Sequence, residues 1–400
     1  MLDLSKRAND LGTENAFVVL AEVNGLIAKG EDILSFCIGQ PDFVTPDPIR
    51  LAAVKAITDG HTGYTPAPGI PALRDAVASY FTRTRGVDVD PESVVCGCGG
   101  KPFISYSVLS LTDYGVGHEV IYPNPGFPIY NSQIRACGAV PVPLALREAR
   151  SFTFDLEDLK QKVNEKTRLL ILCSPHNPTG SILTREDLEG IAEIVKPFDN
   201  CWVYSDEVYS GLVYDGKFQS IASVPGMQER TIIADSTSKT YAMTGWRIGY
   251  AANEKLAPSF ARWNINTDSC PPHPNQYAAL EALNGPQDGA ERMAAIFKER
   301  RGHIVRGLNE IDGVTCLEPG GAFYVWPNVT EACKMTGITD SEEMRKRLLY
   351  DAGIAVLADI HFGSKVEGDG EHVRFSYASS LEAIDEGLSR MNDFMKKNKR

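Results

Sequence analysis

The sequence lacks any long apolar run. No stretch of about 18 consecutive apolar residues occurs, which is roughly the length that a membrane-spanning helix needs. The opening residues, MLDLSKRANDLG, have no apolar core of the kind that a secretion signal carries. We therefore expect a soluble, cytoplasmic protein.

Positive charge and metal-binding cysteine pairs are also scarce. The chain has 40 Lys and Arg against 52 Asp and Glu, a net charge of −12, whereas nucleic acids and anionic membranes select basic surfaces. Its nine cysteines are scattered, and only Cys96 and Cys98 lie close together, with no nearby histidine to complete a zinc set. We predict reduced thiols, no metal site, and neither nucleic acid nor membrane as a partner.

The chain does have length and a regular alternation of apolar runs. Four hundred residues exceed the usual limit of one hydrophobic core, so two domains are expected. Short β-rich runs alternate with helical stretches such as REDLEGIAEIVKPF, and continuous apolar strands separated by helices predict a mostly parallel seven-stranded sheet, an α/β fold. The predicted strands are 93–97, 119–123, 139–144, 168–173, 201–205, 230–235 and 247–252.

The pattern changes after about residue 290. A long charged helix precedes short strands around AFYVW and VRFSYA and a final helix from Leu381. This order is typical of an α+β domain. We predict a large α/β domain over residues 45–290 and a small α+β domain formed by residues 1–44 and 291–400.

Polar side chains follow several of the predicted strands. In open α/β sheets, ligands bind outside the carboxyl ends of the strands, so these side chains are candidates for one site. They are Asn177, Asp206, Tyr209, Ser236, Ser238 and Lys239.

A glycine pair, Gly99 and Gly100, follows the first predicted strand and opens a helix. Glycine lets an anion approach the backbone closely, and a helix N-terminus favours negative charge, so the pair suits a phosphate. The spacing fits neither a dinucleotide fingerprint nor a P-loop. A glycine-rich helix cap explains this motif equally well when it is taken alone.

Three motifs in order, SPHNPTG, SDEVY and STSKTYAMTGWRIGY, resemble those of the class I and II aminotransferases, which are pyridoxal 5′-phosphate (PLP) enzymes of fold type I. The likeness extends from GQPDF (39–43) through GYTPAPGIPALRDAV (63–77) to RFSYA (374–378), nearly the whole chain. It implies an aspartate-aminotransferase-like architecture, in which the small domain closes over the substrate.

The resemblance assigns the chemistry to a few residues. Lys239 is expected to form a Schiff base with PLP and then to carry the proton. Asp206 is expected to face the ring nitrogen, where a carboxylate keeps the ring protonated and electron-accepting. Asn177 and Tyr209 are expected to hydrogen-bond the ring's phenolic oxygen, although turn and packing roles are alternatives for both.

The resemblance also implies how the cofactor is held. Phe127 in PNPGFPIY is expected to stack on its ring, with core packing as the alternative. The planar fork of Arg247 matches phosphate oxygens. The expected phosphate-binding residues are Gly99, Gly100, Lys101, Ser236, Ser238 and Arg247.

Substrate and partner contacts follow in the same way. Arg374 is expected to grip the substrate's α-carboxylate, with Gly39 and Asn177 beside it. Tyr64 is expected to reach the cofactor phosphate of a neighbouring subunit, which makes the active unit a homodimer. The segment 266–280 departs from the family pattern, with Cys270 and His273 in place of small hydroxyl residues, so its contacts with the cofactor are left open.

The implied reaction is a ping-pong transfer of the amino group of an L-amino acid to a 2-oxo acid, 2-oxoglutarate or pyruvate. A β-elimination or cyclising lyase on the same scaffold is an alternative, because one fold serves several fates of the same carbanion. A ligand-sensing regulator is a remote alternative, disfavoured by the acidic composition. The sequence does not identify the amino donor.

Overall fold

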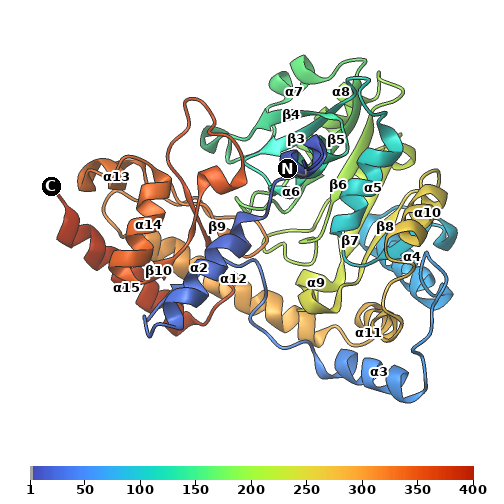
Figure 1. Cartoon of the computed structure of the whole chain (residues 1–400), viewed down its shortest axis with the longest axis horizontal. Coiled ribbons are helices and arrows are strands. Elements are labelled where there is room, and N and C mark those ends of the chain that lie inside the picture. Colours follow the sequence, from blue (N-terminus) through green and yellow to red (C-terminus); the bar gives the residue numbers. More distant parts are fainter. Residues whose placement is uncertain (1–2) are drawn as a thin grey trace.

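The computed structural model describes residues 3–400 (Figure 1). Its main sheet has seven strands in the order β2–β8–β7–β6–β5–β3–β4, which confirms the predicted α/β class. The strands of this sheet are β2 (Val94–Gly97), β3 (Glu119–Asn124), β4 (Val140–Ala145), β5 (Thr167–Cys173), β6 (Trp202–Asp206), β7 (Thr231–Ser236) and β8 (Gly249–Ala252).

Strand direction decides which chain segments reach the edge where ligands bind. Strands β4, β3, β5, β6 and β7 are parallel to one another, while β8 runs antiparallel to both β7 and β2. The carboxyl ends of β5, β6, β7 and β2 therefore meet the amino end of β8 at one edge. Strand β8 lies between β2 and β7, so the glycine pair after β2 lies one strand away from the end of β7.

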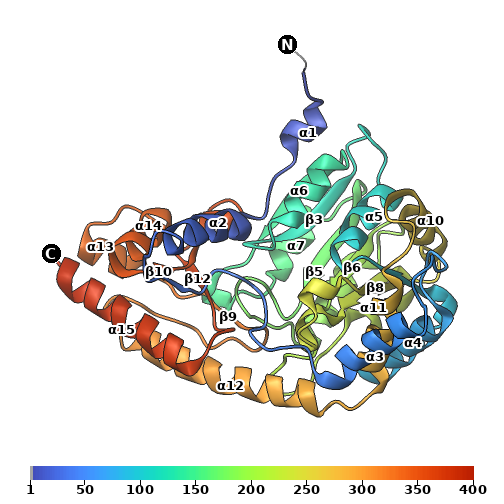
Figure 2. The same ribbon diagram turned by 60° about the horizontal axis from the view of Figure 1, so that its bottom comes forward.

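Helices cover both faces of this sheet and, with a few short strands, build the rest of the molecule (Figures 1 and 2). Their bounds are α1 (Lys6–Asp10), α2 (Asn15–Ile27), α3 (Asp47–Thr58), α4 (Pro71–Arg85), α5 (Lys101–Leu111), α6 (Ile129–Ala136), α7 (Leu156–Lys162), α8 (Arg185–Val195), α9 (Thr237–Thr240), α10 (Ala257–Thr267), α11 (His273–Asn284), α12 (Asp288–Asn309), α13 (Thr330–Thr336), α14 (Ser341–Ala352) and α15 (Leu381–Asn398).

The apolar strands are buried on both faces because their side chains alternate. In β5, Leu169 and Ile171 pack in one core with residues of α5, α6 and α10. Leu170 and Leu172 point the other way and pack with residues of α7 and α8. A strand with helices on both sides needs apolar side chains at every position, which is why RLLILC reads as one continuous apolar run.

The remaining strands are short and join the two ends of the chain. An antiparallel sheet has the order β11–β12–β9, from Leu357–Ala358, Val373–Ser376 and Tyr324–Val325. Strand β1 (Leu34–Ser35) pairs in parallel with β10 (Ile354–Ala355), which fastens the N-terminal segment to the C-terminal region. Helices α12 and α15 run side by side along the outside of this region (Figure 2).

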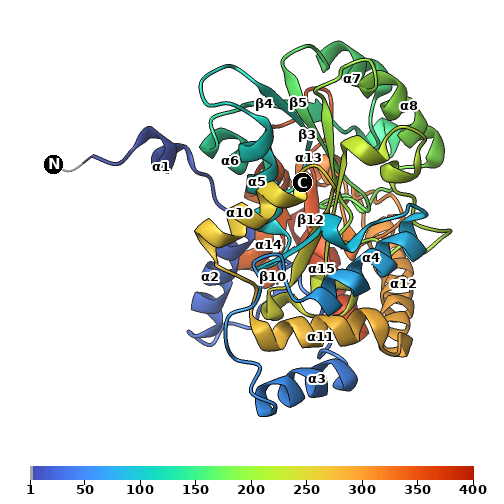
Figure 3. The same ribbon diagram turned by 90° about the vertical axis from the view of Figure 1, so that its right-hand side faces the viewer.

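The N-terminal segment leaves the body of the molecule before α2, and α1 extends outward (Figure 3). Within the segment, the backbone N–H of Gly12 donates to Ser132 Oγ on α6 (3.0 Å). None of the helices formed by residues 3–400 combines the length and apolar character needed to cross a membrane.

Candidate active site

A cavity of about 540 Å³ opens at the sheet edge where β5, β6 and β7 end. Most of the candidate site residues line it, whereas Gly99 lies just behind its wall and Tyr64 lies elsewhere on the surface. The candidates that line the cavity are Gly39, Gly100, Lys101, Phe127, Asn177, Asp206, Tyr209, Ser236, Ser238, Lys239, Arg247 and Arg374.

The strand ends place the reactive groups. Asp206 is the last residue of β6 and Ser236 the last of β7, and Lys239 follows on the short helix α9. Arg247 lies two residues before Gly249, the first residue of β8. Because that strand is antiparallel, Arg247 reaches the same edge. Residues distant in sequence therefore share one cavity wall.

One end of the cavity is built for an anion. Arg247 has a left-handed backbone (φ 58°) and packs against Gly99 (φ 88°), where any Cβ would collide with the guanidinium. Arg247 donates to two neutral acceptors, the carbonyls of Thr244 (2.9 Å) and Cys98 (3.3 Å). No carboxylate in residues 3–400 forms an ion pair with it, so its positive charge is left for a ligand.

The N-terminus of α5 adds donors at the same end. The N-cap residue is Gly100, which has no side chain to cap the helix, and α5 begins at Lys101. Among the described residues, the N–H groups of Gly100 and Lys101 have no hydrogen-bond acceptor. Uncapped N–H groups at a helix start favour bound phosphate.

Lys239 lies between this end and the middle of the cavity. Its Nζ donates to the carbonyl oxygen of Gly39 (2.5 Å) and forms no ion pair with any carboxylate of residues 3–400. Burial lowers the pKa of Lys239 to about 8; Glu14 opposes this shift, and the cations Arg374, Lys101 and Arg247 reinforce it. A lysine with a lowered pKa holds a sizeable fraction of neutral, nucleophilic amine near neutral pH.

Asp206 is held by a tyrosine that the sequence did not reveal as part of the site. Tyr130, on α6 and fully buried, donates its hydroxyl proton to Asp206 Oδ2 (2.7 Å). Burial raises the pKa of Asp206 to about 6, although the bond from Tyr130 lowers it. The only available signal was spacing, because Tyr130 follows Phe127 by about one helical turn.

Arg374 is a buried cation without a counter-charge. Its side chain donates to Asn177 Oδ1 (2.8 Å) and to the carbonyl of Cys37 (2.6 Å), and its Nε has no partner. Only 3% of the residue is exposed, and no carboxylate within the described chain pairs with it. A buried charge is costly unless it is paired, so the cavity is suited to a ligand carboxylate at this position.

A second tyrosine also escaped the sequence analysis. The hydroxyls of Tyr209 and Tyr324 are 2.8 Å apart, and the guanidinium of Arg374 lies 4.4 Å from the centroid of the Tyr324 ring. Gly39 packs so closely on the Tyr324 hydroxyl that a Cβ at this position would collide with it. Burial raises the pKa of both tyrosines, so both hydroxyls stay protonated near neutral pH.

The mouth of the cavity carries an ion pair. Lys101 Nζ contacts Glu14 Oε2 (2.5 Å), and it also lies 5.4 Å from the ring centroid of Phe127 and 5.7 Å from that of Phe17. Lys101 is exposed, and both Lys101 and Glu14 line the cavity. Of the cavity's cations, Lys101 alone is paired with a carboxylate of the described chain.

Tyr64 and the segment 266–280 lie outside the cavity of the single chain. Tyr64 is 89% exposed. The segment 266–280 packs beside it, since Thr65 N donates to Cys270 Sγ (3.4 Å) and His273 Nδ1 is 3.0 Å from the carbonyl of Gly63. No residue of this segment lines the cavity.

A second set of charges is buried next to the cavity, and one of its members, Asp235, also contributes to the cavity wall. Arg85, from the end of α4, contacts Glu207 Oε2 (2.7 Å) and Asp235 Oδ2 (2.5 Å), and each of these side chains is 1% exposed. Ser205 and Ser220 donate to Glu207, and Ser210 donates to Asp235. Glu207 and Asp235 directly neighbour Asp206 and Ser236 in the sequence, so this buried network supports the strand ends that carry the site.

Comparison with known proteins agrees with this architecture. The family model described as "Aminotransferase class I and II" matches residues 31–391. An aspartate aminotransferase of Geobacillus stearothermophilus is 37% identical over 98% of this chain and 99% of its own length. An asparagine–oxo-acid transaminase of Streptococcus mutans is also 37% identical, over 99% of this chain and 100% of its own. A solved aspartate aminotransferase of Thermus thermophilus with maleate superposes with a TM-score of 0.90 at 32% identity, covering 98% of this chain and 100% of that chain.

Proposed function

Because the chain belongs to the class I and II aminotransferases, and is therefore a transaminase that works with PLP, we propose that aspartate is its amino donor and that 2-oxoglutarate or pyruvate is its acceptor. The observation that carries this proposal is the buried, uncompensated Arg374, which faces the same cavity as the exposed Lys101. The two cations suit a substrate with two carboxylates.

The cavity fits PLP. Three features of one end suit a phosphate. They are the free N–H groups of Gly100 and Lys101, the unpaired charge of Arg247, and the close packing of the Arg247 guanidinium on Gly99. We assign its phosphate to these residues with Ser236 and Ser238. The ring would be held by Phe127, Asn177, Asp206 and Tyr209, with Lys239 as the tether. When bound, PLP supplies a ring that accepts electrons as a substrate bond to the α-carbon breaks.

Lys239 is the proton carrier in this proposal. Its pKa of about 8 leaves part of the amine unprotonated near neutral pH. Nζ can therefore accept the α-proton of the substrate and later donate it to a different atom. The carbonyl of Gly39 accepts a hydrogen bond from Nζ and so holds it in a fixed position. Asp206, fixed by Tyr130, stays in place to keep positive charge on the ring nitrogen.

Arg374 orients the substrate. Asn177 and the carbonyl of Cys37 fix its guanidinium, and the ring of Tyr324 lies against it. A carboxylate that pairs with this fixed cation is itself held in one orientation, with Gly39 and Asn177 beside it. Orientation of the α-carbon toward Lys239 lowers the entropic part of the barrier.

Lys101 selects the side chain of the donor. Its present partner, Glu14, is itself at the cavity mouth, so a substrate carboxylate can replace it without burying a new unpaired charge. Lys101→Ala is expected to lower kcat/KM for aspartate while leaving alanine, which has no second carboxylate, little changed. Glu14→Gln frees Lys101 and is expected to lower KM for aspartate.

We propose a homodimer whose active site is completed by Tyr64 of a second copy. Helix α3 exposes a stripe of apolar side chains, Leu51 (64%), Val54 (58%) and Ile57 (56%), and Tyr64 follows it at 89% exposure. Exposed apolar surface of this kind marks protein contacts. Mixing inactive Lys239→Ala protein with Tyr64→Ala protein is expected to restore activity, because hybrid dimers contain one site with both residues intact. No restoration would contradict the shared site.

The chain's organisation and location are part of the same proposal. We assign residues 45–290 to the large PLP-binding domain, and residues 1–44 with 291–400 to the small one; residues 1–2 lie outside the described structure. The pairing of β1 with β10 supports this division. A cytoplasmic location is supported by nine cysteines that are all free.

A donor screen tests the function. With 2-oxoglutarate or pyruvate as acceptor, kcat/KM for aspartate is expected to exceed that for phenylalanine about 10-fold or more, which corresponds to about 1.4 kcal/mol. Asparagine, which the name of one relative gives as its substrate, is the control donor, because it has the size of aspartate but an uncharged side chain. A higher value for asparagine or phenylalanine would contradict the assignment of aspartate.

A half-reaction tests the ping-pong mechanism. Aspartate alone, without acceptor, is expected to release one equivalent of 2-oxo acid per site and no ammonia. A lyase would instead release ammonia over many turnovers.

A further inference from the structure

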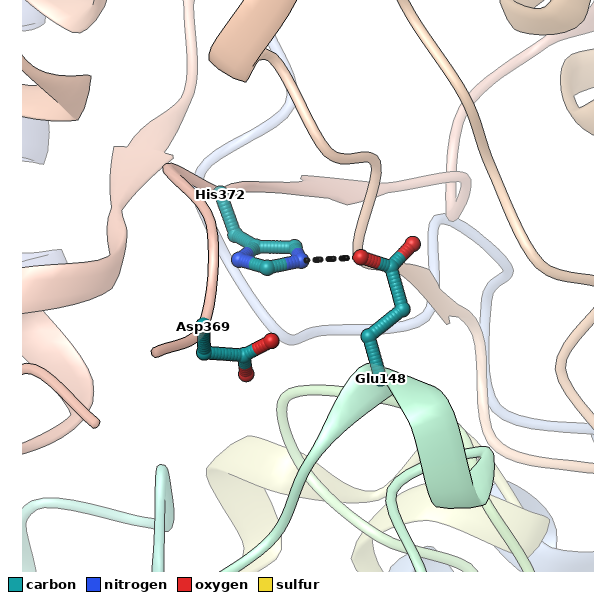
Figure 4. A group of neighbouring side chains, drawn as sticks. All are labelled: Glu148, Asp369 and His372. Atoms are coloured by element: carbon teal, nitrogen blue, oxygen red, sulfur yellow. Dashed lines mark ion pairs between the residues drawn. The ribbon is translucent and has the colours of Figure 1, made fainter. Parts of the chain in front are cut away.

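A group of three potential metal ligands, Glu148, Asp369 and His372, lies outside the active-site cavity, and none of them lines it (Figure 4). Glu148 comes from the turn after β4, while Asp369 and His372 come from the segment that leads into β12. Their ligand atoms all lie within 4.8 Å of one another. His372 is 2% exposed, and the two carboxylates are half-buried, so the group has a side open to solvent.

The protonation of His372 follows from its hydrogen bond. Nδ1 lies 3.0 Å from the carbonyl oxygen of Gly370, which can only accept, so Nδ1 carries a proton. In the neutral ring, Nε2 then presents a lone pair. This Nε2 is buried, has no hydrogen-bond partner, and lies 3.4 Å from Glu148 Oε2. A lone pair that faces carboxylates is repelled unless a positive charge lies between them.

No other cation of the described chain neutralises this group. Within residues 3–400, His372 is the only ion-pair partner of Glu148, and Asp369 has none. With a neutral imidazole, the group carries two negative charges. The surroundings therefore favour a bound cation.

The groups around the ligands match those of metal sites. Histidines that bind metals usually donate their other ring N–H to a carbonyl or carboxylate, as His372 does to Gly370. Ligating carboxylates are usually hydrogen-bonded in turn, and Asn328 Nδ2 donates to Glu148 Oε2 (2.6 Å). The imidazole is also stacked on Trp326, with ring centroids 5.7 Å apart and planes 7° from parallel. Nε2 is thus held in a fixed direction.

We propose that Glu148, Asp369 and His372 bind a divalent transition-metal ion of the zinc type. One imidazole and two carboxylates suit Zn²⁺, which prefers four-coordinate sites with nitrogen and oxygen ligands, and a water from the open side supplies the fourth ligand. The spacing of 3.4 Å between Nε2 and Oε2 is close to the separation of two ligands about 2.0–2.2 Å from one tetrahedral zinc. Asp369 closes the set by a small movement of its side chain.

The ion would join two parts of the chain that bear on substrate binding. It links the turn after β4 to His372, which directly precedes β12 and lies two residues before Arg374. Trp326, which stacks on His372, also packs against Phe362 (5.3 Å), and the Arg374 guanidinium lies 4.8 Å from the Phe362 ring. The site is structural: it fixes the strand that carries the carboxylate-binding arginine and takes no part in the chemistry.

Titration of the chelator-treated holoenzyme with ZnCl₂ tests the proposal. Calorimetry is expected to show one high-affinity Zn²⁺ per chain. Asn328→Ala, which removes the supporting hydrogen bond, is expected to weaken binding about 10- to 100-fold, the usual effect of losing such a partner. Asp369→Asn and His372→Gln, which remove ligands, are expected to weaken it further.

A matched control is His303→Gln. His303, on α12, contacts Asp385 on α15 and is not one of the three proposed ligands. The His303→Gln variant is therefore expected to bind Zn²⁺ as the unchanged protein does. Co²⁺ in place of Zn²⁺ is expected to give the absorption of a tetrahedral site, which disappears in Asp369→Asn. Circular dichroism of each variant establishes that it is folded, and Asp369→Asn tests the proposal if His372→Gln does not fold.

Three results would overturn the site. These are an absence of stoichiometric binding, binding that Asp369→Asn and His372→Gln leave unchanged, and a stable imidazolium at His372 by NMR in protein saturated with Zn²⁺. In the last case, a protonated His372 supplies the positive charge that the two carboxylates require.

Discussion

Two groups of charges lie near the ends of β6 and β7, and they differ in how they are paired. In the cavity, Lys239, Arg247 and Arg374 have no carboxylate partner within the described chain. Next to it, Arg85 pairs with both Glu207 and Asp235. The other oxygen of Glu207 accepts from Ser205 and Ser220, and the other oxygen of Asp235 accepts from the backbone N–H of Ser236. The charges of the Arg85 network are balanced by other side chains of the protein, whereas the cations of the cavity are available to pair with ligands.

This difference separates stability from function. Breaking the internally paired network leaves buried charges without partners, so its loss costs folding free energy. Removing an unpaired cation from the cavity costs little folding energy, and it instead weakens the binding or the chemistry of the ligand. The predictions below test this division.

The largest effect is expected for Lys239→Ala. Loss of the proton carrier is expected to lower kcat about 10²- to 10⁴-fold. The melting temperature of the apo-protein is expected to stay the same or to rise, because a buried ammonium is removed. Lys255→Ala, at a surface lysine beside Trp202, is the control and should retain activity. Near-normal turnover by Lys239→Ala would contradict the role of this lysine.

Arg85→Met is expected to act on stability instead. Two buried carboxylates lose their cation, so the free energy of unfolding in urea is expected to fall by about 3–5 kcal/mol. The triple variant Arg85→Met, Glu207→Gln, Asp235→Asn removes all three charges and is expected to recover much of this loss. If Arg85→Met unfolds normally but loses kcat, the division between the two groups is wrong.

Arg374→Lys sharpens the comparison within the cavity. Lysine keeps the charge but lacks the planar fork, so one charged hydrogen bond to the substrate is expected to be lost. The expected fall in kcat/KM is about 10-fold or more, since such bonds contribute about 1.5–3 kcal/mol. Unfolding in urea is expected to change little. An equal loss of kcat/KM for a donor without an α-carboxylate would contradict the assigned role.

A smaller effect is expected in the pH dependence of the apo-protein. The pKa of Lys239 is about 8 when folded and has an ordinary value of 10.5, so between these values the unfolded chain binds the extra proton. Stability therefore rises with pH across this window, by up to about 1.4 kcal/mol per pH unit. Urea unfolding of the unchanged protein and of Lys239→Met between pH 8 and 10 isolates this contribution. Parallel curves for the two proteins would contradict the lowered pKa.

Much of the fold could be predicted because the sheet is buried on both faces. Each of the seven main strands was predicted within two residues of its bounds, since continuous apolar runs ending at polar groups mark such strands. The two-residue strands β1, β10 and β11 were not predicted, because pairs of residues carry no periodic signal. Their pairing depends on tertiary contacts between the two ends of the chain.

The candidate site divides in a similar way. Residues at strand ends or within family motifs were named from the sequence, and the structure places most of them around one cavity. Tyr130 and Tyr324 were missed because their role depends on partners 76 and 115 residues away. The contact of Arg85 with Asp235 spans 150 residues, and that of His372 with Glu148 joins segments that are even farther apart in the sequence. Local pattern does not reveal such pairs.

The central claim is that one lysine tethers PLP at the end of β7. Reduction of the holoenzyme with sodium borohydride, followed by digestion and mass spectrometry of the peptides, tests it most directly. The account predicts the cofactor's mass on the peptide that contains Lys239 and on no other. The same label on another lysine, such as Lys101, or no label on any peptide, would contradict it.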